Sequence, residues 1–117
     1  MQNRKVYEME AIEIVKNIGE GKTPYERAVY LMNAYKDLKN GKEIMQESRE
    51  VIELMDKVFS LIDDDPYIDI VEYHYKKGYG AKKTAYKMGI DVTTLYRQRR
   101  RIAKRVAIIL YGDKALI

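Results

Sequence analysis

One stretch near the C-terminus, residues 82–101, constrains the fold more than any other; it reads KKTAYKMGIDVTTLYRQRRR. Ala85, Gly89 and Leu95 have the spacing of a helix-turn-helix. In that motif a small residue lets the second helix approach the first, a glycine opens the turn and an aliphatic residue anchors the second helix. Arginine fills four of the six positions after Leu95, and no acid follows until Asp113. A helix pair with a cationic second member predicts a DNA-binding motif.

Charge is divided unevenly along the chain, although the total is only +4. Residues 1–65 hold 10 Lys/Arg and 14 Asp/Glu, whereas residues 66–117 hold 12 Lys/Arg and 4 Asp/Glu. The basic half coincides with the predicted helix-turn-helix. This coincidence favours a module that binds a polyanion over a basic surface that is merely solvated.

Composition limits the class of protein. A chain of 117 residues with 46% hydrophobic residues can build one domain, or a small domain with a helical extension. There are no cysteines, which excludes disulfides, thiolate zinc sites and cysteine nucleophiles and fits a reducing cytosol. No apolar run approaches the ~20 residues of a membrane span, and the first ten residues lack the apolar stretch of a signal peptide. We expect a soluble, cytoplasmic protein with no membrane partner.

Every periodic segment indicates a helix, and no stretch alternates with period two. The expected fold class is therefore all-α, a helical bundle with a C-terminal helix-turn-helix and an N-terminal helical extension. Helices are expected over residues 6–18, 23–38 and 42–62. Thr23, Pro24 and Glu26 form a capping box that should start the second helix, and Asn40-Gly41 should end it. The residues expected to face the core are Ala28, Leu31, Met32, Tyr35 and Leu38, followed by Ile44, Val51, Leu54, Met55, Val58, Leu61 and Ile62.

The third helix fits a packed bundle helix better than a coiled-coil strand, and homodimerisation through it remains an alternative. After it, Asp65 and Pro66 predict the start of a fourth helix over residues 66–77, with Ile68, Val71 and Tyr75 facing inward. A fifth helix is expected over residues 81–88 and a sixth over residues 92–110, capped by Asp91. We divide the chain into a helical region, residues 1–62, for oligomerisation or partner contact, and a DNA-binding domain, residues 63–117.

The sixth helix separates two faces at 100° per residue. Leu95, Ile102, Val106 and Ile109 share one face, which should pack on the fourth and fifth helices. The opposite face should enter the major groove, where arginine can donate two hydrogen bonds to guanine. Side chains at the start of the fifth helix are placed for phosphates. The predicted DNA-binding residues are Lys82, Lys83, Thr84, Thr93, Thr94, Tyr96, Arg97, Arg100, Arg101 and Lys104.

Other candidate sites carry weaker signals. Arg99 falls near the buried stripe, so it should lie along the core edge or pair with an acid such as Glu72. His74, the only histidine, has no partner nucleophile, and a surface or core-edge position is preferred to catalysis. The acids at 63–65 fit helix capping better than a metal site. Tyr75, Tyr79 and Tyr86 lie among lysines, and core-edge positions are preferred to base stacking. We expect no enzyme, metal or cofactor.

Several residues in the second half of the chain carry a resemblance to known proteins, namely Tyr75, Lys77-Gly78, Thr84-Ala85, Met88-Gly89-Ile90, Thr93 to Arg97 and Leu110 to Asp113. From residue 61 onward the chain resembles region 4 of bacterial sigma factors. More closely, it is similar to the small phage-encoded transcriptional regulators of the ArpU and RinA type. The resemblance implies a phage or prophage late-gene activator that binds double-stranded DNA, with RNA polymerase as a second partner. Nothing resembles the promoter-melting domain of a full sigma factor, so an accessory regulator is the better interpretation. Residues 25–38 are similar to the leader helix of these regulators.

Two other functions stay open at this point. A DNA-packaging adaptor of the small terminase type also joins a helix-turn-helix to an oligomerising helical part. A protein that contacts a sigma factor or RNA polymerase would use the motif for protein interaction instead. Oligomer mass separates the first from a regulator, and salt-sensitive binding to a duplex argues against the second. The sequence gives neither the operator nor the sign of regulation.

Overall fold

The computed structural model describes residues 22–42 and 46–112, and this part of the chain is helical, without a strand. The expected all-α class is confirmed for these residues. The predicted helix over residues 6–18 and the core position Ile44 lie outside them. In chain order the helices are α2 (Pro24–Asp37), the π-helical η1 (Leu38–Lys42), α3 (Gln46–Ser60), the π-helical η2 (Val71–Lys76), α4 (Ala81–Met88) and α5 (Val92–Tyr111).

Helix α2 begins and ends as predicted. The Thr23 hydroxyl accepts a hydrogen bond from the amide of Glu26, and the Glu26 carboxylate accepts one from the amide of Thr23, both at 3.1 Å. At the other end Gly41 leaves the helical conformation with φ +101°. The predicted inner face of α2 is confirmed, because Leu31 and Tyr35 are completely buried.

The segment after α3 differs from the prediction. The amides of Leu61 and Ile62 bond to carbonyls three residues back, which turns Leu61 outward to 62% exposure while Ile62 remains buried. The predicted inward position of Leu61 is therefore wrong. A regular helix also does not start at Pro66. Instead, the Asp65 carboxylate accepts from the amide of Tyr67 at 2.9 Å, and three-residue turns lead into η2.

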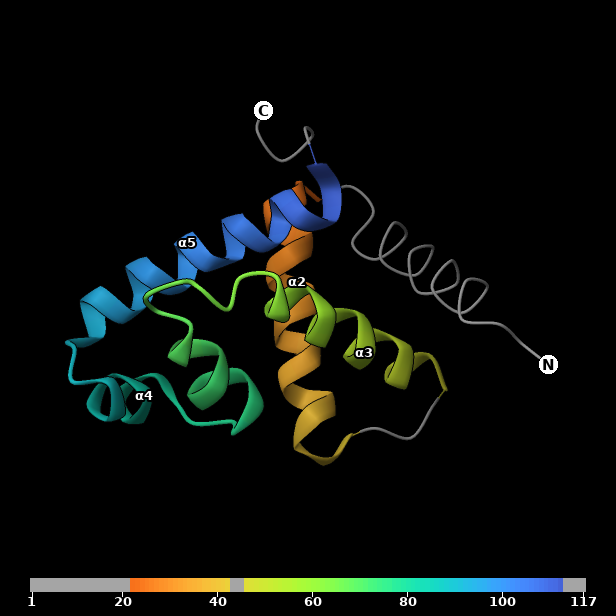
Figure 1. The fold of residues 1–117 in the computed structure, drawn as a ribbon. Coiled ribbons are helices and arrows are strands. Elements are labelled where there is room, and N and C mark those ends of the chain that lie inside the picture. Colours follow the sequence, from red (N-terminus) through yellow and green to blue (C-terminus); the bar gives the residue numbers. More distant parts are fainter. Residues whose placement is uncertain (1–21, 43–45, 113–117) are drawn as a thin grey trace.

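The long helix α5 crosses α2 and forms one core with it (Figure 1). We predicted that α5 packs on the fourth and fifth helices. In the structure its most extensive contact is with α2, which the prediction did not include. Tyr35 of α2, Phe59 of α3 and Tyr75 of η2 form a run of ring contacts through this core, with centroids 5.2 and 6.2 Å apart. The core therefore crosses the boundary placed at residue 62, and separate roles for the two regions remain a prediction.

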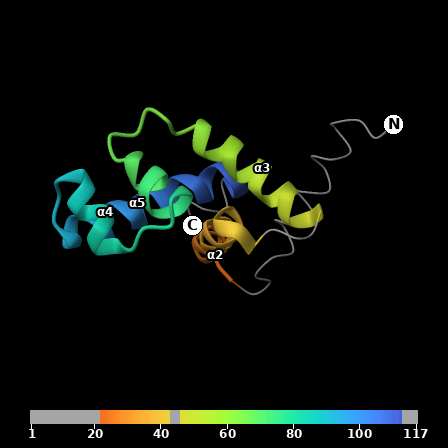
Figure 2. The ribbon, with the colours of Figure 1, turned by 90° about the horizontal axis from the view of Figure 1, so that it is seen from below.

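Helices α4 and α5 match the predicted residues 81–88 and 92–110 to within one position. Gly89 ends α4 in the left-handed conformation with φ +69°, which a glycine adopts without a steric cost. The Asp91 carboxylate accepts from the amide of Thr94 at 2.7 Å and caps α5. Figures 1 and 2 place α4 beside the N-terminal half of α5, at the end of the molecule away from α3.

Gly78 fixes the approach of η2 to α2. Its φ is +76°, and a Cβ at this position would lie 2.7 Å from the side-chain oxygen of Asn40. The side-chain amide of Asn40 in turn donates to the carbonyls of Lys36 and Tyr75, at 2.6 and 3.4 Å. The turn between η2 and α4 thus starts with a backbone conformation that favours glycine.

Candidate nucleic-acid interface

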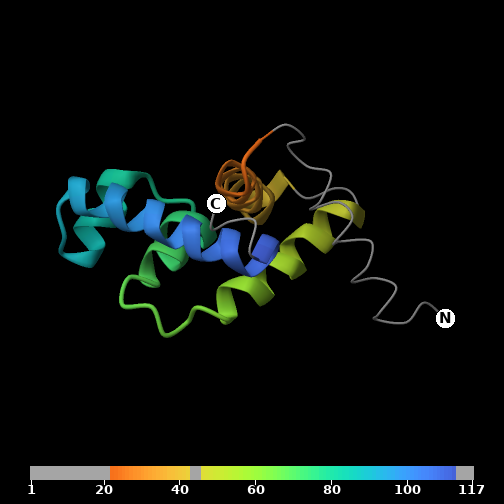
Figure 3. The same ribbon diagram turned by 90° about the horizontal axis from the view of Figure 1, so that it is seen from above.

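The two faces of α5 are those expected from its periodicity. Leu95, Ile102 and Val106 are buried, at no more than 1% exposure. Seen from above, α5 extends from the end of the molecule that holds α4 to the crossing with α2 (Figure 3). The side chains on its opposite face are exposed, namely Thr93, Arg97, Arg100 and Lys104, with Tyr96 beside them at 44% exposure. We call these five residues the outer strip of α5.

Ile109 does not belong to the buried face, contrary to the prediction. It is 37% exposed, whereas Ala103 and Ala107 are 2% exposed. The buried side of α5 shifts because α2 crosses its C-terminal half from another direction (Figure 1). The outer strip therefore ends near Lys104.

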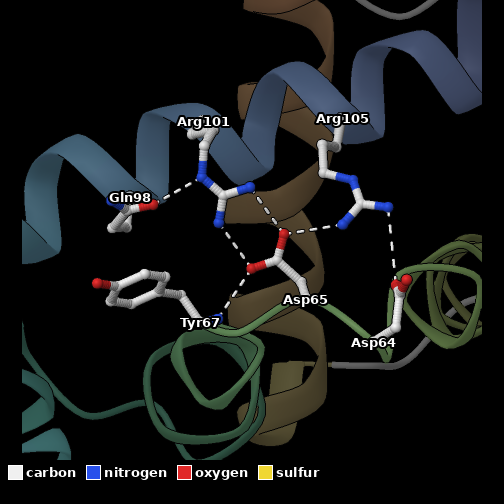
Figure 4. Close-up of polar contacts among 6 residues, drawn as sticks. All are labelled: Asp64, Asp65, Tyr67, Gln98, Arg101 and Arg105. Atoms are coloured by element: carbon white, nitrogen blue, oxygen red, sulfur yellow. Dashed lines mark hydrogen bonds and ion pairs between the residues drawn. The ribbon is translucent and has the colours of Figure 1, made fainter.

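Arg101 has hydrogen-bond partners inside the protein that the sequence did not predict. Its two terminal nitrogens donate to the two carboxylate oxygens of Asp65 at 2.8 and 2.7 Å, and its Nε donates to Gln98 at 2.6 Å (Figure 4). Three of the five guanidinium donors are thereby used inside the protein. We therefore do not count Arg101 in the outer strip of α5, and its contact with DNA stays a prediction.

Asp65 is the centre of this cluster. Its side chain is 0% exposed, and it also accepts from Arg105 at 2.8 Å, while Asp64 lies 3.7 Å from the same guanidinium. The hydrogen bond from Arg101, more than any other contact, holds the pKa of Asp65 well below its usual range, against the opposing effect of burial. The cluster, which joins residues 36 positions apart, ties α5 to the loop after α3. Sequence reasoning found only the capping role of Asp65.

Arg99 and His74 form a second internal contact. The Nη1 atom of Arg99 lies 3.3 Å from Nε2 of His74, and Nδ1 of His74 lies 2.7 Å from the carbonyl oxygen of Tyr79. A neutral imidazole protonated on Nδ1 satisfies both bonds. The Arg99 guanidinium also lies 5.2 Å from the ring centroid of Tyr96. Arg99 thus lies at the core edge, as expected, with His74 rather than Glu72 as its hydrogen-bond partner.

We predict that His74 makes the stability of the protein depend on pH. The side chain is 6% exposed, and burial lowers its pKa, so the folded state favours the neutral ring. We expect the free energy of unfolding to fall as the pH drops below about 6.5, because the unfolded chain then takes up the proton first, with a slope of up to about 1.4 kcal/mol per pH unit. Urea unfolding between pH 7.5 and 5.5 measures this. His74→Gln should abolish the slope, and an equal slope in both proteins would disprove the assignment.

Thr84 was predicted to contact phosphate, and this prediction is wrong because the side chain is 0% exposed. Its hydroxyl oxygen is buried without a hydrogen-bond partner in the part of the chain that the structure describes. The residue therefore packs α4 against the core and cannot reach a ligand outside it.

Removal of the buried Thr84 hydroxyl should increase the stability of the protein. Thr84→Val keeps the shape and removes an unpaired polar group, so we expect the free energy of unfolding to rise by about 1 kcal/mol. Thr84→Ser, which keeps the hydroxyl and loses the methyl group, should lower it. Urea unfolding of the two variants decides the point: a loss of stability in Thr84→Val would show that the hydroxyl has a partner.

The lysines of α4 lie on its exposed side. Lys82 and Lys83 are both exposed, as predicted. The Lys83 ammonium lies 4.0 Å from the ring centroid of Tyr79, which stacks on Tyr73 at 6.1 Å, and Lys77 lies 5.2 Å from the Tyr73 ring. Lys83 is thus held in place by a cation–π contact. Thr94, in contrast, is half-buried beside the cap of α5.

The described residues hold no group of three His, Cys, Asp or Glu side chains arranged to bind a metal. Within the same ranges, no helix has the length and apolar character of a membrane span. Comparison with protein-family models, with curated proteins and with solved structures finds no match to this chain. A function must therefore be argued from the outer strip of α5 and its surroundings.

Proposed function

We propose that this protein is a sequence-specific regulator of transcription that binds double-stranded DNA, with α4 and α5 as a helix-turn-helix like that of sigma factor region 4. The observation that carries the proposal is the outer strip of α5. It places Arg97, Arg100 and Lys104 in solvent on a helix whose other side is fixed in the core. Arginines on one face of a helix can reach base edges in a major groove.

The charge around this strip supports a polyanionic partner. Residues 81–112 contain nine Lys/Arg and a single acid, Asp91, whose carboxylate is engaged in capping α5. Arg99, Arg101 and Arg105 have partners within the protein, so the exposed positive charge is concentrated on the outer strip and on α4. Such a concentration of charge attracts DNA, and the arginines of the strip would then read the bases.

The narrower biological role rests on the sequence resemblance. We propose that the protein activates late genes of a phage or prophage in the host cytoplasm and that RNA polymerase is a second partner. The regions of the chain not used for DNA, above all α3 and the residues before α2, would supply that contact or a homodimer interface.

Selection of bound fragments from a random DNA pool tests the proposal directly. A regulator should enrich one sequence, and binding to that sequence should weaken steeply as salt is raised. Enrichment without a common sequence, together with a ring-shaped oligomer, would point to a packaging adaptor instead. Failure to bind any duplex at low salt would leave a sigma- or polymerase-contacting protein and refute the proposal.

A further inference from the structure

The exposed side of α4 has an unusual composition. Lys82, Lys83, Tyr86 and Lys87 are all exposed, whereas Thr84 and Ala85 on the other side are buried. Successive positions differ by 100°, which places Tyr86 between Lys82 and Lys83 around the helix. We call the four exposed residues the α4 platform.

Tyr86 is the most exposed of the large hydrophobic side chains in the described ranges, at 83%. Tyr75 is 4% exposed, and the Lys83 ammonium lies over the Tyr79 ring. The structure therefore accounts for Tyr75 and Tyr79, the other two tyrosines that the sequence places among lysines. Packing among the described residues does not account for Tyr86. A tyrosine exposed among lysines combines an apolar ring, a hydroxyl donor and positive charge, which is the composition of a surface that meets a polar, negatively charged partner.

We propose that the α4 platform docks on the phosphodiester backbone beside the groove that α5 reads, with Tyr86 as an additional DNA-binding residue. Its phenol donates a hydrogen bond to a phosphate oxygen, its ring covers the adjoining sugar, and the three lysines neutralise neighbouring phosphates. This inference rests on the proposed function.

Geometry favours DNA over an acidic protein surface as the occupant. A three-residue turn joins the platform to the outer strip of α5, and the two helices lie side by side (Figure 2). A ligand large enough to cover α5 would therefore also reach α4. From Lys82 to Lys87 the axis of α4 advances about 7.5 Å. Two to three successive phosphates of one DNA strand span roughly the same distance along the duplex axis. A DNA duplex presents negative charges in a regular row at this spacing, whereas an acidic protein surface does not.

Binding measurements on the full chain test this role of Tyr86. The probes are the duplex enriched from the random pool and a scrambled duplex of equal length. We expect Tyr86→Phe to weaken binding about 5-fold to 10-fold and Tyr86→Ala to weaken it further, because a hydrogen bond to a charged group is lost first and the ring contact second. Both losses should be similar on the two duplexes, since backbone contacts carry no sequence information. Lys87→Ala should lower the slope of log affinity against log salt by about one, whereas Tyr86→Phe should not change it.

Tyr30 provides a matched control. It is an exposed tyrosine of α2, 48% accessible, with the Lys22 ammonium 5.3 Å from its ring. Tyr30→Phe and Tyr30→Ala should bind as the wild type does. Circular dichroism and thermal unfolding should match the wild type for all four variants, because neither side chain is buried.

The outcomes separate the two proposals. If the wild type binds the enriched duplex and Tyr86→Ala binds equally well, the platform does not meet DNA and this inference is wrong, while the proposed function stands. If the wild type binds no duplex, both are wrong. A substitution of the flanking phosphates by neutral methylphosphonates gives a second measurement: the loss from Tyr86→Phe should disappear on that duplex, and an undiminished loss would place Tyr86 elsewhere.

Discussion

Asp65→Ala will lower the free energy of unfolding by about 2–4 kcal/mol, the largest effect on stability that we expect from a single polar side chain here. The change removes the shared acceptor of Arg101 and Arg105 and frees the amide of Tyr67 (Figure 4). The side chains of Arg101 and Arg105 are 40% and 37% exposed, so water replaces part of the lost interaction and the expected loss stays moderate. Urea unfolding at pH 7 measures the difference.

Asp64 is the natural control for this prediction. It is 78% exposed and lies 3.7 Å from Arg105, so Asp64→Ala should cost less than about 0.5 kcal/mol. Asp65→Asn should fall between the two alanine variants, because its amide oxygen can still accept from Tyr67 or from one arginine. Equal losses in Asp64→Ala and Asp65→Ala would show that the cluster contributes little.

The contribution of Asp65 should also depend on pH. Its pKa is lowered in the folded state, so its stabilisation is complete above the unfolded value of about 3.9 and is lost as the pH falls below that value. The wild type and Asp65→Ala should therefore approach each other in stability at pH 2–3. This window lies well below that of His74, which begins near pH 6.5.

Sequence signals with a local cause predicted the structure well. The capping box at Thr23, the glycine at position 89 and the cap at Asp91 each act within three or four residues, and each is found as predicted. The amphipathic faces of α2 and α5 follow from helical periodicity alone. These features placed the helix pair and the outer strip of α5 correctly within the described residues.

Interactions between distant parts of the chain were not predictable in the same way. Asp65 already had a satisfactory explanation as the cap of the expected fourth helix, and nothing local indicated that it would bind Arg101 across 36 residues. The spacing of Arg101 and Arg105, one helical turn apart on the flank of α5, is a signal from which a shared acid could have been inferred, although we did not infer it from the sequence. The burial of Thr84 depends on how α4 packs against α5 and η2, which periodicity does not describe.

Replacing Arg97 or Arg100 by alanine should cause the largest loss of DNA binding. We expect each variant to bind the enriched duplex about 10-fold to 100-fold more weakly, since a bidentate contact with a base contributes ~1–3 kcal/mol. On a scrambled duplex the loss should be much smaller, because only the charge interaction with phosphate remains to be lost. Fluorescence anisotropy at several salt concentrations, on both duplexes, measures the affinity and its salt slope together.

Lys39→Ala removes the same charge from an exposed position in η1, at the end of α2 away from α5 (Figure 1). Its binding should match the wild type on both duplexes, which separates a specific contact from the effect of net charge. Lys83→Ala provides the other comparison: a phosphate-contacting lysine should weaken binding to the enriched and scrambled duplexes by the same factor and lower the salt slope by about one. If Arg97→Ala behaved like Lys83→Ala, the outer strip of α5 would contact the backbone rather than the bases. In that case sequence preference would have to come from the deformability of the DNA, and the assignment of α5 as the reading helix would be wrong.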